Sequence, residues 1–62
     1  MADFLNVTPG NVDFVVWFDY VTDEIRARGY NGKIDRDSFE FDYNKNLMVG
    51  TAVEEFLQDQ DY

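Results

Sequence analysis

The chain has no cysteine and no histidine among its 62 residues. Without cysteine it can form no disulfide and no thiolate metal site, which fits a reducing compartment. Without histidine it lacks the commonest general base and the commonest transition-metal ligand. A domain this short buries only about 60% of the surface that its unfolded chain exposes. Its stability must therefore come from its aromatic residues, 18% of the chain, or from self-association.

Basic residues are also scarce, with five against thirteen acidic ones, so the net charge is −8. Residues 1–25 carry −5 and residues 46–62 carry −4, whereas residues 26–45 contain all five bases and carry +1. A charge of this size repels nucleic acid and anionic membranes and attracts basic protein surfaces. We therefore expect no direct binding of nucleic acid or membrane, and a protein partner with a basic surface.

Long hydrophobic runs are missing too. No apolar stretch reaches the roughly 18 residues of a membrane span, and no basic-then-apolar signal peptide opens the chain. We expect a cytoplasmic protein, or one in the host cytoplasm if it is viral. With no linker or internal repeat, we interpret residues 1–62 as a single acidic interaction domain.

The strongest pattern is an amphipathic helix over residues 11–28. Apolar residues recur at helical spacing on one face of it: Phe14, Trp17, Phe18, Val21 and Ile25. Asn11 is the favoured N-cap, although Thr8 followed by Pro9 is also a good helix start. Gly29 is the expected stop.

The middle of the chain has two interpretations. Phe39, Phe41 and Tyr43 alternate with polar residues, which is typical of a strand. Residues 44–46 then form a turn, and residues 47–49 return as the second strand of a β-hairpin. The alternative is a second helix over residues 35–46, with Phe39 and Tyr43 four residues apart on one face.

Residues 51–54 form a capping box, with Thr51 as N-cap and Glu54 three residues later, so a short helix is expected at about residues 52–60. The predicted fold class is α+β: a small single domain with a long N-terminal helix, a central β-hairpin and a short C-terminal helix. If the middle segment is helical, the fold is instead an all-α three-helix domain.

Residues 31–39 resemble the second half of an EF-hand calcium loop, with Gly32 at the sharp turn and Ile34 after it. The same alignment places Ala27 and Gly29 where the first two carboxylates of that family belong, and Ser38 where the bidentate glutamate belongs. The ion-binding charge is missing, so we predict no metal and no cofactor.

No catalytic arrangement is present. Paired carboxylates can act as acid and base only in a pocket that separates their pKa values. The acidic pairs in this chain, such as Glu54 and Glu55, lie in polar sequence, and we interpret them as solvated charge. There is also no phosphate-binding loop and no nucleophile–base pair, so we predict that the chain is not an enzyme.

Apolar and acidic residues remain as candidates for binding a partner. Trp17 lies on the main apolar face, so we expect it in the core, with an interface role as the alternative. Val16 and Tyr20 form a second stripe beside it and are candidate contacts. The acidic candidates, expected to project from the two terminal helices, are Asp19, Asp23, Glu54, Glu55, Asp59 and Asp61.

These features lead to two functional hypotheses. In size and charge the chain resembles the small acidic host-takeover proteins of bacteriophages, a likeness of composition alone. It implies a non-catalytic inhibitor that presents carboxylates as a nucleic-acid mimic to a nucleic-acid-binding protein. The alternative is a structural or assembly accessory subunit of a larger particle, or a homo-oligomer, that uses the apolar surface of the long helix.

Overall fold

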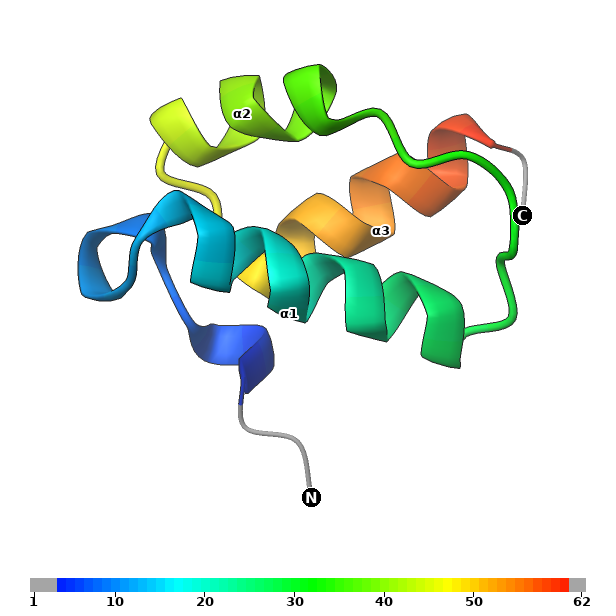
Figure 1. Cartoon of the computed structure of the whole chain (residues 1–62), viewed down its shortest axis with the longest axis horizontal. Helices are drawn as coiled ribbons and strands as arrows, with labels where there is room; N and C mark the ends of the chain where they lie inside the picture. The colour runs from blue at the N-terminus through cyan, green and yellow to red at the C-terminus, as the bar shows by residue number, and fades with distance from the viewer. Residues whose placement is uncertain (1–3, 61–62) are drawn as a thin grey trace.

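Three α-helices form the body of the protein in the computed structural model, which describes residues 4–60 (Figure 1). They are α1 (Phe14–Ala27), α2 (Arg36–Asn44) and α3 (Val49–Asp59), preceded by the short 3₁₀ turns η1 (Phe4–Asn6) and η2 (Pro9–Asn11). No strand occurs within residues 4–60. The predicted α+β fold with a central β-hairpin is therefore wrong, and the all-α three-helix alternative describes the protein.

The segment predicted as a hairpin is the helix α2 because only two of its three aromatic residues face inward. Phe39 is buried and Tyr43 is half-buried, whereas Phe41 is 64% exposed. A strand would place all three on one side. The helix begins with Asp35 as N-cap, whose carboxylate accepts a hydrogen bond from the backbone N–H of Asp37 at 3.1 Å.

Both α1 and α2 end in the same backbone motif. The N–H of Gly29 bonds to the carbonyl of Arg26, and the N–H of Tyr30 bonds to that of Ile25. Gly29 has φ 99°, the left-handed conformation in which glycine is favoured. Asn46 has the equivalent position after α2, with φ 65°. The residues predicted as the hairpin turn are thus the C-terminal cap of a helix.

The helix starts differ from those predicted. The N-cap of α1 is Asp13, with no side-chain capping bond, and Asn11 lies in η2. The N-cap of α3 is Met48, so Thr51 lies inside the helix and does not cap it. The N–H of Val49 instead bonds to the carbonyl of Val7 at 3.0 Å. The N-terminal segment therefore supplies a backbone acceptor to the first turn of α3.

The core lies where α1 meets α2 and α3. Trp17 is fully buried, as predicted, and its indole N–H donates to the carbonyl of Leu47 at 3.1 Å. Its ring centroid lies 6.4 Å from that of Phe39 and 5.5 Å from that of Tyr43. The buried residues of this cluster are Trp17, Val21, Ile25, Phe39, Val49, Ala52, Val53 and Leu57.

Aromatic and polar contacts hold the connecting segments. The hydroxyl of Tyr43 donates to the carbonyl of Val12 at 2.8 Å, which ties α2 to the segment before α1. The ring of Tyr30 packs edge-on against Phe56, with centroids 5.2 Å apart. The loop between α1 and α2 therefore passes the C-terminal part of α3 (Figure 1). Between α2 and α3 themselves, the ring centroids of Phe39 and Phe56 lie 5.2 Å apart, and this placement creates the candidate site.

Candidate functional site

Two of the predicted acidic residues lie beside a third that the sequence did not indicate. Glu55 and Asp59 are exposed and one turn apart on α3, and both act electrostatically on Asp42 of α2. We call Asp42, Glu55 and Asp59 the acidic cluster. Burial raises the pKa of the Asp42 carboxyl above its ordinary value, and the charge of Glu55 raises it further. Lys45 lowers this pKa, and Asp59 makes a smaller contribution upward.

An exposed aromatic ring adjoins the acidic cluster. Phe41 precedes Asp42 on α2 and is 64% exposed. The ammonium of Lys45 lies 5.1 Å from the centroid of the Phe41 ring, within the range of a cation–π contact. Within residues 4–60 the structure contains one ion pair, between Arg28 and Glu24, so none of the three carboxylates of the cluster is ion-paired there. The arrangement offers acceptors for a cationic partner beside an apolar contact.

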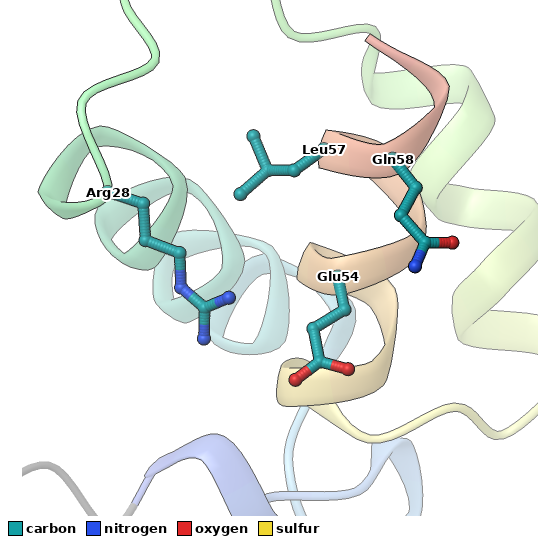
Figure 2. Close-up of a pocket in the computed structure, with 4 residues that line it drawn as sticks. All are labelled: Arg28, Glu54, Leu57 and Gln58. Carbon is teal, nitrogen blue, oxygen red and sulfur yellow. The ribbon is translucent and has the colours of Figure 1, made fainter. Parts of the chain in front are cut away.

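Glu54 lies on a different side of α3 from its neighbour Glu55. It lines a pocket with Arg28, Leu57 and Gln58 (Figure 2). Arg28 projects into this pocket from the end of α1, and its Nε is paired with the Glu24 carboxylate at 2.8 Å. Glu54 therefore lies beside the pocket that Arg28 enters, is not among the residues that act on Asp42, and is not part of the acidic cluster.

The remaining predicted residues are spread along α1. Asp19 lines a groove between α1 and α2, and Asp23 is exposed. Val16 is 39% exposed, while Tyr20 is half-buried and packs against the core. Asp61 lies outside the described residues. Among the members of the predicted set that lie within residues 4–60, Glu55 and Asp59 belong to the acidic cluster, whereas Asp19, Asp23 and Glu54 lie elsewhere.

The raised pKa of Asp42 makes its charge unfavourable for folding. The pKa of Asp42 is higher in the folded than in the unfolded chain. As the pH rises through these two pKa values, the folded state holds the proton longer, so the free energy of unfolding falls. Above both values the ionised carboxylate makes the fold less stable. We expect Asp42→Asn to raise the melting temperature at pH 7 by about 1–3 °C. The effect is small because the carboxylate is only partly buried, so water still screens its charge.

This gain depends on pH and has a matched control. Below about pH 3 the Asp42 carboxyl is protonated in both the folded and the unfolded chain. Asp42→Asn should then have the same melting temperature as the wild type. Asp23→Asn removes the same charge from an exposed position on α1. Thermal melts followed by circular dichroism at several pH values would test this. An equal gain from Asp23→Asn, or a gain that persists in acid, would contradict the proposed cause.

The segment that resembles an EF-hand has another role in the fold. Asp35 caps α2, and the loop before it is held by the guanidinium of Arg26, which donates to the carbonyls of Tyr30 and Gly32 at 3.1 and 2.8 Å. Among the residues that the structure describes, no group of three or more acidic side chains is arranged to hold a metal ion.

Comparison of the chain with protein-family models, curated proteins and solved structures finds no match. Across residues 4–60, none of the helices has the length and apolar character that crossing a membrane requires. The protein is thus a small acidic domain whose described residues form three α-helices.

Asp42 and Phe41 were not predicted as site residues because a strand was expected there. With α2 as a helix, Phe41 projects away from the buried Phe39, whereas Asp42 is three residues after Phe39, at the half-buried edge of the face that packs on the core. The available signal was Asp35, a good N-cap four residues before Phe39. The other residues missed are Val15 and Arg36, which line the groove with Asp19 and become neighbours only once α2 is placed.

Proposed function

We propose that this chain is a non-catalytic binding protein that docks on the basic surface of a nucleic-acid-binding protein and competes there with nucleic acid. The observation that carries the proposal is the acidic cluster, three carboxylates from two helices with no ion-paired cation within residues 4–60. The excess negative charge of the chain, −8 in 62 residues, supports it. Such a partner would associate rapidly, and its affinity would fall as salt rises.

The neighbouring Phe41 supports a specific contact over a purely diffuse attraction. An exposed phenylalanine can bury a large apolar area at an interface, while the carboxylates beside it pair with lysine or arginine. A basic groove that binds nucleic acid offers both features when apolar or aromatic side chains line it.

Charge reversal within the cluster provides the test. The double variant Glu55→Lys/Asp59→Lys changes the net charge from −8 to −4 and places cations beside Asp42. Close charge pairs at interfaces couple strongly, so we expect the affinity for the partner to fall by roughly 100-fold. The partner is first isolated on immobilised wild-type protein from a lysate of the source organism, and its affinities are then measured by calorimetry.

The matched control is Glu54→Lys/Asp23→Lys, which gives the same net charge from two exposed positions outside the cluster. It should lose much less affinity than the cluster variant. The isolated partner should bind DNA or RNA, and wild-type protein should displace that nucleic acid at low salt. Equal losses in both double variants, or a partner whose nucleic-acid binding is unaffected, would contradict the proposal.

A second candidate is an assembly subunit that uses the apolar surface of α1. Val15 and Val16 are adjacent and are 62% and 39% exposed. A partner bound there would be retained at high salt, and its binding would fall with Val15→Ser and remain with the cluster variant. The salt dependence of the retained partner therefore distinguishes the two candidates.

A further inference from the structure

A groove with apolar walls runs between α1 and α2. It has a volume of about 360 Å³ and is lined by Phe14, Val15, Phe18, Asp19 and Arg36. Phe14 and Phe18 are half-buried and stack on each other with ring centroids 5.6 Å apart. Val15 is 62% exposed at the side of the groove, so an apolar side chain and an apolar depression lie next to each other.

The two charged residues of the groove have opposite signs and come from different helices. Asp19 belongs to α1, whereas Arg36 is the first residue of α2 and lies 5.3 Å over the Phe14 ring. Within residues 4–60 neither of them forms an ion pair. Their charges cancel locally, although the whole chain carries −8. The groove is thus a neutral part of the surface of a strongly acidic molecule.

We propose that a second copy of this chain occupies the groove in a two-fold dimer. In a two-fold interface, if residue i contacts residue j of the other copy, then j contacts i. Val15 of each copy would enter the groove of the other, and Asp19 of each copy would face Arg36 of the other. The two-fold axis therefore repeats each contact: the dimer contains two Val15–groove contacts and two Asp19–Arg36 ion pairs.

Charge complementarity favours a second copy over an unrelated ligand. The acidic and basic residues line the same groove as three apolar side chains and form no ion pair within residues 4–60, so the surface is complementary to itself. A stable interface covers about 800 Å² on each partner, roughly a fifth of the 4143 Å² surface of this chain. The groove is smaller than that, so we infer a dimer that forms at high protein concentration. The acidic cluster takes no part, so this inference is independent of the proposed function.

The test measures molar mass by sedimentation equilibrium from low micromolar to millimolar concentration. Physiological salt is used because it largely screens repulsion between charges more than about 8 Å apart. Wild-type protein should approach the dimer mass. Asp19→Arg and Arg36→Asp should each weaken dimerisation by at least roughly 10-fold, because each places like charges opposite one another twice. Val15→Ser should weaken it through loss of the apolar contact.

The charge-swapped variants also test the pairing directly. Mixing Asp19→Arg with Arg36→Asp places opposite charges at both positions, so the mixture should form a heterodimer although neither variant self-associates. Asp23→Arg makes the same charge change as Asp19→Arg on the same helix, outside the groove, and should dimerise like the wild type. Circular dichroism establishes that each variant is folded, and Arg36→Gln replaces Arg36→Asp if the latter is not.

Three results would overturn this proposal. They are a wild-type protein that remains monomeric at millimolar concentration, single variants that dimerise as well as the wild type, and a mixture that associates no better than its components. Because no other protein is present in this experiment, its failure would not affect the proposed binding of a basic partner.

Discussion

Replacing Trp17 by alanine should remove a large part of the protein's free energy of unfolding and sharply lower its melting temperature. Large-to-small changes of buried aromatic residues cost about 3–5 kcal/mol. At about 0.05–0.15 kcal/mol per residue, a domain of this length has a free energy of unfolding of only about 3–9 kcal/mol. Trp17 is fully buried, and its ring meets residues from both α1 and α2. Its removal also takes the indole donor from the carbonyl of Leu47.

Thermal and guanidinium unfolding followed by far-ultraviolet circular dichroism would measure this loss. Trp17→Phe keeps an aromatic ring and removes the hydrogen bond, so it should fold with a reduced melting temperature. Val15→Ala changes an exposed residue of the same helix and should alter the free energy of unfolding by less than about 0.5 kcal/mol. A Trp17→Ala protein with the wild-type melting temperature would show that the aromatic cluster is not the core.

The sequence was sufficient to predict α1 because its pattern is long. Its apolar positions recur over three turns, and a strand cannot produce that spacing. Trp17, Val21 and Ile25 are fully buried, and Gly29 follows the C-cap in the left-handed conformation, as expected for the stop. The start was misplaced because several good caps lie close together in sequence. The backbone turns at η2 before the helix begins at Phe14.

The middle segment was misassigned because six residues carry too little periodic information. Phe39 and Tyr43 fit both a strand and a helix, and only the position of Phe41 differs between the two. What decides is tertiary packing: Phe39 lies 5.2 Å from Phe56 of α3, and Tyr43 lies 5.3 Å from Phe14 of α1, measured between ring centroids. Neither contact can be read from the local sequence.

The candidate site depends on the same segment. Glu55 and Asp59 could be selected from sequence as exposed acids on a helix, but their neighbour Asp42 could not, because it comes from α2. Glu54 was grouped with them by sequence, although it faces Arg28. Charge composition therefore suggested a basic partner, which stays a prediction, whereas the choice among carboxylates required the relative placement of α2 and α3.

The helical assignment of α2 makes opposite predictions for two phenylalanines that are two residues apart. Phe39→Ala should lower the free energy of unfolding by about 3–4 kcal/mol, because Phe39 is 1% exposed and its ring contacts Trp17, Phe18 and Phe56. Phe41→Ala should change it by less than about 0.5 kcal/mol, because most of that side chain already lies in water and alanine favours a helix. Paired guanidinium unfolding curves would measure both.

Phe39→Ala and Phe41→Ala are matched controls for each other, because both delete the same side-chain atoms from positions two residues apart. In a hairpin, residues 39 and 41 would share a face of one strand, and both substitutions would destabilise the fold. Equal losses would therefore favour the strand. If Phe41→Ala is neutral for stability, its effect on partner binding can be measured without interference from unfolding. A loss of affinity would then assign Phe41 to the interface, because the Lys45 ammonium that lies over its ring is also on the surface.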